Sequence, residues 1–242
     1  MIALLCSVQA EAQLLLSNLS VTGTTRIGSK SIIAGTLAGR DVLLCVGGMG
    51  KVNAAHAAAL MISEFSPDAL LIFGVGGAYP SSGAAVGDIA LAQVEIAGDE
   101  GVLTHDGFKD MEYIGIPLLK TSTSVIFTTY PASEHLLKRA LHSLGCTSGS
   151  GMTGIHSGTF VTLSTCTGTT SRARDLEDRY HGLCENMEGA AAAQVAGLHE
   201  IPWLEVRGIS NLVEDRDTQK WDIPKAAEAG QRAILRILGG WE

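Results

Sequence analysis

Short apolar segments that end in glycine or polar residues alternate with helix-like segments along this chain, and this alternation limits the possible folds more than any other feature. The apolar segments are typical of buried strands, which we predict at residues 2–8, 69–80, 86–102, 154–163 and 203–206. The segments between them have the leucine spacing or small-residue content of helices packed on a sheet, at residues 10–19, 51–65, 189–200 and 223–238. Strands that alternate with helices indicate parallel pairing, with helices on both faces of the sheet.

Residues 30–50 differ from this pattern, because two apolar runs flank a turn at residues 39–41 and predict a hairpin. A hairpin adds antiparallel pairing to the sheet. We therefore predict an α/β fold with a three-layer αβα arrangement around a mixed, mostly parallel central sheet. No linker or internal repeat is visible, so we expect one domain over residues 1–242.

The composition excludes several classes of protein. The chain is 46% hydrophobic and 17% charged with a net charge of −8, and it has no run of lysine or arginine, so nucleic acid is not an expected partner. No apolar segment reaches the ~18 residues of a membrane span, and the N-terminus does not have the pattern of a signal peptide. The cysteines are odd in number and never spaced as CxxC, which favours reduced thiols, a cytoplasmic location and no zinc site: Cys6, Cys45, Cys146, Cys166 and Cys184.

Nearly every predicted strand is followed by unusual residues. Glu11 follows the first strand, and glycine-rich or polar segments stand at the later strand ends, at residues 47–51, 74–78, 158–160, 186–189 and 207–211. Ligands of open α/β sheets bind beyond the carboxyl ends of strands. The sequence therefore predicts a binding site built from these segments.

The two glycine-rich segments do not match nucleotide-binding motifs. In the segment 47–51, Cys45 occupies the position of the first glycine of a P-loop, and Val52 replaces the Mg²⁺-binding hydroxyl residue. The segment 74–78 does not match GxGxxG. The glycines either allow the backbone to approach a small ligand or turn the chain, and we expect no cofactor and no metal.

Two acids and an amide are the candidates for chemistry. Glu11 and Glu188 could each be an acid at a helix N-terminus, or they could divide the work of a glycosidase, one activating water and the other binding sugar hydroxyls. Asn211 could be a turn or N-cap residue. Ser210 is not surrounded by GxSxG, so a serine nucleophile is not indicated.

Several short motifs, in this order and spacing, resemble the nucleoside phosphorylase/nucleosidase superfamily over nearly the whole chain. They are SVQAE (7–11), VGGMGKVNAA (46–55), FGVGGA (73–78), VGDI (86–89), SGTFV (157–161), NMEGAA (186–191) and VRGISN (206–211). Within the superfamily the chain is similar to the methylthioadenosine/S-adenosylhomocysteine nucleosidases, and NMEGAA, RGISNLVEDRD and Trp221 are most similar to the futalosine hydrolases of menaquinone biosynthesis. The resemblance implies the superfamily's fold, a small nucleoside as substrate, and a homodimer or higher homo-oligomer.

The resemblance also implies roles for individual residues. Glu11 matches the acid that orients or deprotonates the attacking water, and Met187 and Glu188 match the pair that contacts the ribose. Phe160 matches an aromatic residue that stacks on the purine, while Val161 presents backbone groups to it. The remaining matches to the binding site are Val75, Gly76, Gly77 and Ser210, with Arg207 as a supporting residue.

This sequence departs from the adenine-specific nucleosidases at position 211, where they have aspartate and this chain has asparagine. A carboxamide donates to a 6-oxo group and accepts from N7–H, but it is not a general acid. We therefore expect a 6-oxopurine nucleoside, with hydrolysis of futalosine to hypoxanthine and dehypoxanthine futalosine as the implied reaction. The alternatives are a methylthioadenosine/S-adenosylhomocysteine nucleosidase, a purine nucleoside phosphorylase, which would need more cations than Lys51, and a nucleoside-binding protein without turnover.

Overall fold

The computed structural model describes residues 1–145 and 154–241, so Cys146 and most of the Gly/Ser-rich segment around it lie outside the described residues. Ten strands form one sheet: β1 (Ile2–Cys6), β2 (Ser20–Ile27), β3 (Lys30–Leu37), β4 (Arg40–Val46), β5 (Ala69–Ala78), β6 (Ile89–Ala97), β11 (Thr129–Pro131), β12 (Ile155–Thr162), β13 (Gly182–Asn186) and β14 (Trp203–Leu212). The helices are α1 (Gln9–Asn18), α2 (Lys51–Phe65), α3 (Met111–Ile114), α4 (Glu134–Ser143), α5 (Thr170–Tyr180), α6 (Gly189–Leu198) and α7 (Ile223–Gly239). Two short strand pairs, β7 (Gly101–Thr104) with β8 (Gly107–Asp110) and β9 (Leu119–Lys120) with β10 (Val125–Ile126), and the 3₁₀ helices η1 (Pro80–Ser82) and η2 (Thr218–Lys220) complete the described elements.

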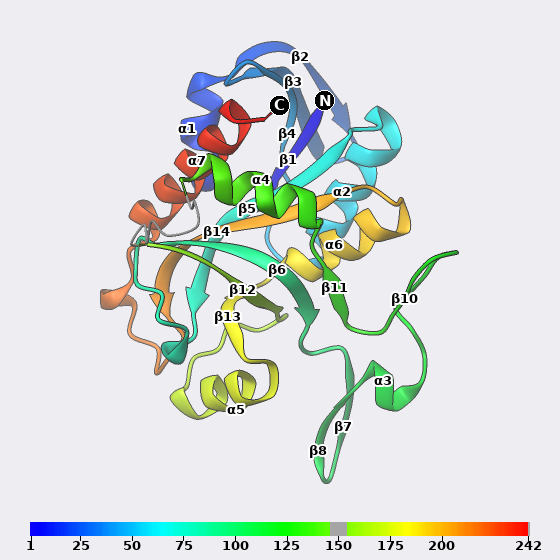
Figure 1. The fold of residues 1–242 in the computed structure, drawn as a ribbon, viewed down its shortest axis with the longest axis vertical. Helices are drawn as coiled ribbons and strands as arrows, with labels where there is room; N and C mark the ends of the chain where they lie inside the picture. Colours follow the sequence, from blue (N-terminus) through cyan, green and yellow to red (C-terminus); the bar gives the residue numbers. More distant parts are fainter. Residues whose placement is uncertain (146–153, 242) are drawn as a thin grey trace.

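The sheet is mixed, and in the described part of the chain parallel pairs do not predominate. Parallel pairs join β1 to β4 and β5, β5 to β14, and β12 to β6 and β13, whereas β2, β3 and β4 form an antiparallel meander. Strand β13 also pairs antiparallel with β5, and β14 pairs antiparallel with β6. Strands β5, β14, β6, β12 and β13 therefore form a closed ring, in which each strand pairs with the next and β13 pairs again with β5. This ring brings together the ends of strands that are distant in the sequence (Figure 1).

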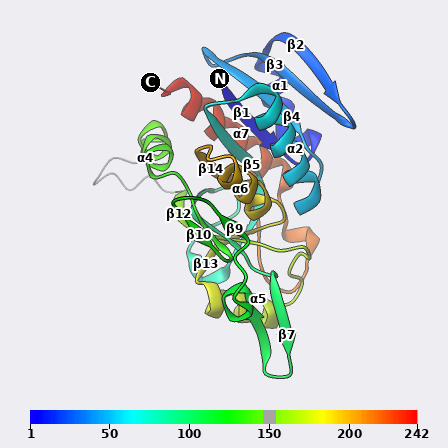
Figure 2. The ribbon, with the colours of Figure 1, turned by 90° about the vertical axis from the view of Figure 1, so that its right-hand side faces the viewer.

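Helices cover the sheet on both sides (Figures 1 and 2). Helix α6 packs on α2, and the small residues that the two helices share, including Ala57, Ala58, Ala192 and Ala196, are fully buried and allow this close approach. Helix α7 packs on β5, β14 and α1 on the other side. Its apolar face, which includes Ile234 and Ile237, lies in a separate core cluster with Leu4 of β1 and Leu44 of β4.

The chain between β6 and β11 extends away from the sheet as a hairpin of β7 and β8 followed by α3 (Figure 1). Apolar side chains on this arm are exposed, including Leu103 at 81%, Tyr113 at 67% and Ile116 at 61%. No helix within residues 1–145 or 154–241 is long and apolar enough to cross a membrane.

Strand β14 is longer than the sequence suggests, and this changes the setting of position 211. The strand continues to Leu212, so Asn211 lies within it and not beyond its end. Ile209 pairs with Gly76 and Asn211 with Gly77, which leaves Ser210 as an additional residue in a β-bulge. A bulge redirects the side chains that follow it, and here it turns the carboxamide of Asn211 toward the functional cavity described below.

Candidate active site

A cavity of about 260 Å³ lies at the carboxyl ends of β1, β5 and β13, beside β14 and the N-terminus of α6. Most of the residues that the sequence singles out line it: Glu11, Val75, Gly76, Gly77, Met187, Glu188, Arg207, Ser210 and Asn211. Met49 and Asn186 lie in segments that the sequence predicts to build the site, and Ser7, Val8 and Trp221 belong to the motifs that carry the resemblance. The lining residues that were not anticipated from the sequence are Cys166, Thr167, Glu185, Val213 and Ile223. The structure thus brings together segments that are up to 216 residues apart in the chain, from Ser7 to Ile223.

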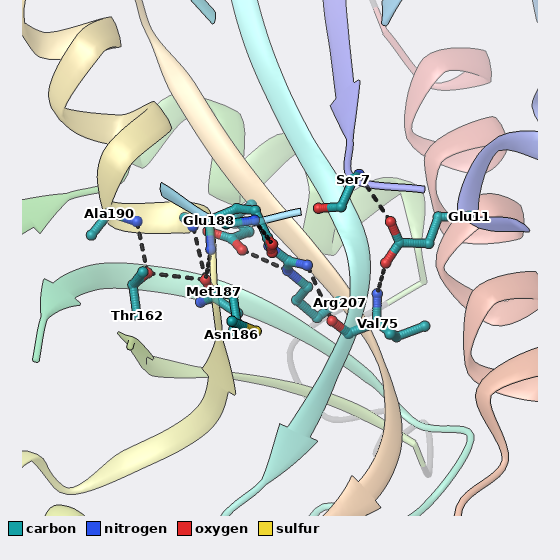
Figure 3. A network of polar contacts seen from close by, with 12 residues as sticks. Ser7, Glu11, Val75, Thr162, Asn186, Met187, Glu188, Ala190 and Arg207 are labelled. Carbon is teal, nitrogen blue, oxygen red and sulfur yellow. Dashed lines mark hydrogen bonds and ion pairs between the residues drawn. The ribbon is translucent and has the colours of Figure 1, made fainter. Parts of the chain in front are cut away.

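Glu11 is buried at the first turn of α1, with its carboxylate held by three backbone N–H groups (Figure 3). One oxygen accepts from the N–H of Ser7 at 2.9 Å and of Val8 at 3.0 Å, and the other accepts from the N–H of Val75 at 2.8 Å. The first two contacts cap the helix, and the third connects it to β5. A Cβ atom at position 74 would lie 2.5 Å from Oε1 of Glu11, so glycine is required there for this approach.

Glu188 is the N-cap residue of α6, yet its side chain does not cap the helix. Oε1 accepts from the N–H of Gly50 at 2.8 Å, and Oε2 accepts from Nη2 of Arg207 at 3.2 Å (Figure 3). The helix is capped instead by Oδ1 of Asn186, which accepts from the N–H groups of Glu188 at 2.9 Å and Gly189 at 2.8 Å. The carboxylate of Glu188 therefore remains in the cavity wall, as a functional role requires and a capping role does not.

Arg207 is only 1% exposed and connects the acids behind the cavity. Its Nε donates to Glu205 at 2.6 Å, Nη1 donates to the carbonyl of Val75 at 3.1 Å, and Nη2 donates to Glu188. Burial alone would lower the pKa of Arg207, but the negative charges of Glu205, Glu188 and Glu11 outweigh burial and raise it. The guanidinium is permanently charged and supports the site, which agrees with the supporting role inferred from the sequence.

Another buried acid, Glu95 on β6, lies against Glu205 on the neighbouring β14. Oε2 of Glu95 accepts from Oγ1 of Thr162 at 2.8 Å, and its Oε1 accepts from Nδ2 of Asn186. Burial, followed by the adjacent charge of Glu205, raises the pKa of Glu95 well above its ordinary value. Oε2 of Glu205 has no donor among the described side chains, and the raised pKa of Glu95 favours a protonated carboxyl that can donate to it.

Asn211 lines the cavity with its carboxamide fixed by its neighbours. Its Oδ1 accepts from Oγ of Ser210 at 2.7 Å, and its Nδ2 donates to the carbonyl of Leu212 at 2.9 Å. Nδ2 carries a second hydrogen, which the Leu212 contact does not use. The amide can therefore offer a donor to a ligand without giving up its internal contacts.

Phe160 and Val161 are not in the cavity wall, unlike what the resemblance implies. Both side chains are fully buried: Phe160 lies in the core cluster with the alanines of α6, and Val161 lies in a cluster with Tyr79 and Leu163. Register shifts in β12 beside Gly158 and Thr159 determine which way these residues face. The cavity wall on this side consists instead of Cys166 and Thr167, in the loop that follows β12.

Lys51, the cation beside the glycine-rich loop, is engaged by two acids. Its Nζ forms ion pairs with Asp99 and, at 3.0 Å, with Glu100. These two partners raise the pKa of Lys51 against the opposing effect of burial. Lys51 is not among the residues that line the cavity, and among the described residues no group of histidine, cysteine and acidic side chains is arranged to hold a metal ion.

Comparison with known proteins agrees with this geometry. A profile of the phosphorylase superfamily matches residues 1–239, and the chain belongs to that superfamily. The futalosine hydrolase of Streptomyces coelicolor is 32% identical over 208 residues, which cover 82% of this chain and 80% of that protein. The 5′-methylthioadenosine/S-adenosylhomocysteine nucleosidase of Mycobacterium bovis is 26% identical over 249 residues, covering 98% of this chain and 96% of the relative.

A solved structure of the 5′-methylthioadenosine/S-adenosylhomocysteine nucleosidase of S. pneumoniae, with a transition-state inhibitor, superimposes with a TM-score of 0.83. It is 22% identical and covers 100% of this chain and 99% of that one, so it shows the shared fold. The superfamily and its nucleoside phosphorylase-like α/β fold are thereby confirmed. The chain is an N-glycosidase enzyme, a nucleosidase of the type that the futalosine hydrolases and methylthioadenosine/S-adenosylhomocysteine nucleosidases represent.

Proposed function

We propose that this enzyme hydrolyses the N-ribosidic bond of futalosine, releasing hypoxanthine and dehypoxanthine futalosine in menaquinone biosynthesis. The observation that carries the proposal is the carboxamide of Asn211, which lines the same cavity as Glu11 and Glu188. A 6-oxopurine offers an oxygen to the free N–H of this amide, whereas the 6-amino group of adenine would oppose it with another donor. A buried mismatch of this kind costs about 1–3 kcal/mol.

The proposed chemistry divides the work among three side chains. Glu11 orients and activates a water molecule for attack on the ribose C1′, since its carboxylate is fixed by N–H groups from two elements. Glu188 and Met187 bind the ribose hydroxyls and ring as positive charge develops on the sugar. Asn211 stabilises the departing base by hydrogen bonding, and because a carboxamide does not donate a proton, the base leaves with a proton supplied by solvent or the ring.

Water is the proposed acceptor in preference to phosphate. Lys51 is paired with Asp99 and Glu100, and Arg207 is occupied by Glu205, Glu188 and the Val75 carbonyl. Phosphate binding in place of water would need cations that are free of carboxylates. Product formation that is unchanged when phosphate is added supports this proposal, and phosphate-dependent formation of ribose 1-phosphates contradicts it.

The proposal is tested by incubating the purified protein separately with futalosine, inosine and methylthioadenosine and identifying the released base. We expect hypoxanthine from futalosine with a kcat/KM at least tenfold above that for adenine release from methylthioadenosine, as one mismatched hydrogen bond predicts. The matched variant Asn211→Asp should reduce this ratio, because aspartate can accept from a 6-amino group and can carry a proton. Equal efficiency on both nucleosides in the unaltered enzyme contradicts the proposal.

The second candidate is a methylthioadenosine/S-adenosylhomocysteine nucleosidase. It is supported by relatives with that name, one of which is 26% identical over 98% of this chain. Adenine as the main product in the same assay would establish it. A protein that releases no base from any of the three nucleosides would instead fit a nucleoside-binding protein without turnover.

We further propose that residues 1–242 form one nucleosidase domain that acts in the cytoplasm as a homodimer or higher homo-oligomer. The support for assembly is the arm of β7, β8 and α3, whose exposed apolar side chains include Leu103 and Tyr113. Burial of such side chains between subunits is favourable. The mass in solution, measured by light scattering for the natural protein and for Leu103→Glu, tests this part of the proposal.

A further inference from the structure

A carboxylate that the proposed mechanism does not use, that of Glu185, also lines the cavity. Glu185 on β13 is paired with Gly77 on β5, and Gly77 is paired with Asn211 on β14. Paired residues on neighbouring strands direct their side chains to the same face of a sheet. Glu185 and Asn211 therefore face the cavity together, two strand spacings apart, with a glycine between them.

The glycine leaves the space between the two side chains free. A Cβ atom at position 77 would lie 3.1 Å from Nδ2 of Asn211 and 2.8 Å from a methyl group of Val213. Two strand spacings amount to about 9.6 Å between the outer backbones. This width suits the edge of one heterocyclic ring, contacted by the amide on one side and the carboxylate on the other.

The carboxylate of Glu185 is fixed from behind. Oε1 accepts from the N–H of Thr167 at 2.7 Å, and Oε2 accepts from Oγ1 of Thr167 at 2.6 Å and from the hydroxyl of Tyr79 at 3.3 Å. Burial raises the pKa of Glu185, while these donors counteract the rise. Three donors occupy three of the roughly four lone-pair sites of the carboxylate, and Oε1, which accepts from Thr167 alone, has capacity for a further donor.

A 6-oxopurine presents a matching pair of groups along one edge, a carbonyl oxygen at C6 and an N–H at N1. Adenine presents the opposite pair, an amino donor at C6 and an acceptor at N1. We propose that Glu185 is a specificity-determining residue that accepts the N1–H of a 6-oxopurine while Asn211 donates to its C6 oxygen. This inference rests on the proposed function and adds a second contact to the base, one that adenine cannot make.

The test measures inhibition of nucleoside hydrolysis by free hypoxanthine, 1-methylhypoxanthine and adenine, in the natural enzyme and in Glu185→Gln. The natural enzyme should bind hypoxanthine about tenfold to a hundredfold more tightly than 1-methylhypoxanthine, which has no N1–H. In Glu185→Gln this preference should fall to within about threefold, because an amide nitrogen replaces one of the acceptor oxygens. Inhibition by adenine should be equal or stronger in the variant.

Tyr79→Phe is the matched control, since it removes one hydrogen bond to Glu185 from outside the cavity wall. If Glu185 acts only by positioning the Thr167 loop, Tyr79→Phe and Glu185→Gln will each weaken the binding of hypoxanthine and of 1-methylhypoxanthine by the same factor. The ratio of the two inhibition constants will then be the same as in the natural enzyme. An unchanged ratio in Glu185→Gln overturns the inference, as does equal binding of the two bases to the natural enzyme or no inhibition by hypoxanthine. The analogue comparison in the natural enzyme needs no variant to fold.

The failure of this inference differs from a failure of the proposed function. Release of hypoxanthine from futalosine, together with equal binding of hypoxanthine and 1-methylhypoxanthine, removes only the role of Glu185. Adenine as the preferred released base removes the proposed function and the inference together.

Discussion

The buried pair of Glu95 and Glu205 predicts an unusual dependence of stability on pH. Glu95 is fully buried, and its pKa is raised well above 4.5 by burial and by the adjacent Glu205. The charged groups that face the pair are Arg207, bonded to Glu205 on the same strand, and Glu188 on the far side of that arginine. A raised folded-state pKa means that the folded protein keeps a proton that the unfolded chain releases. The contribution of Glu95 to the free energy of unfolding is therefore greatest below about pH 4.5 and falls as the pH rises toward its folded-state pKa.

The replacement Glu95→Gln removes this titration while keeping the shape of the side chain. Its NH₂ group can donate to Oε2 of Glu205, as the protonated acid does, although it is a poorer partner for the amide of Asn186, with a constant cost of about 1 kcal/mol. One retained proton changes the free energy of unfolding by about 1.4 kcal/mol per pH unit. Between the ordinary pKa of a glutamate and the raised folded-state pKa of Glu95, the natural protein should therefore lose stability relative to Glu95→Gln as the pH rises, by up to about 1.4 kcal/mol per pH unit.

Urea unfolding followed by circular dichroism at several pH values between 5 and 7 gives this difference directly. The control is Glu64→Gln, an exposed replacement on α2, whose curve should run parallel to that of the natural protein. Parallel curves for Glu95→Gln as well would refute the reasoning, because they would mean that Glu95 is ionised in the folded protein.

Two further predictions concern the same network. Gly189→Ala should lower the free energy of unfolding by at least about 2 kcal/mol, because its Cβ would meet carboxyl oxygens of both Glu95 and Glu205. The control is Gly239→Ala, whose Cβ meets nothing within 4 Å. Equal stability of the two variants in urea would contradict the packing argument. Glu11→Gln should reduce kcat by about a hundredfold or more with little change in KM, because the amide cannot activate water and presents a donor to the surrounding N–H groups. Steady-state kinetics that show a kcat within about threefold of the natural enzyme would exclude Glu11 as the base.

The strongly periodic and apolar elements could be predicted from the sequence. Helix α2 begins and ends where its small-residue composition indicates, and α7 follows its apolar face to within one residue. Strand β2 and helices α4 and α5 were not predicted. Strand β2 is almost entirely exposed, and α5 (TSRARDLEDRY) is mostly charged. Neither segment therefore has the pattern of apolar residues from which a strand or helix is predicted.

The residues of the site that belong to short motifs could be predicted from the sequence, whereas contacts between strands that are distant in the sequence could not. Glu11, Glu188 and Asn211 came from motifs, and all three line the cavity. The neighbour of Glu95 could not be inferred, because β14 pairs with β6 only through closure of the sheet into a ring. A signal was nevertheless present in Glu205, since an acid in the apolar strand WLEV implies a buried partner.

The charges around the cavity indicate which acceptor the enzyme uses. The raised pKa of Glu95 favours its neutral form, and the carboxylates of Glu11, Glu188 and Glu205 face a single cation, Arg207, so the wall of the cavity carries excess negative charge. Excess negative charge stabilises a ribosyl group that becomes positive as the glycosidic bond breaks. The same charge opposes the approach of phosphate, an anion, but not of a neutral water molecule. The network that positions Glu188 thus favours hydrolysis over phosphorolysis, independently of which purine departs.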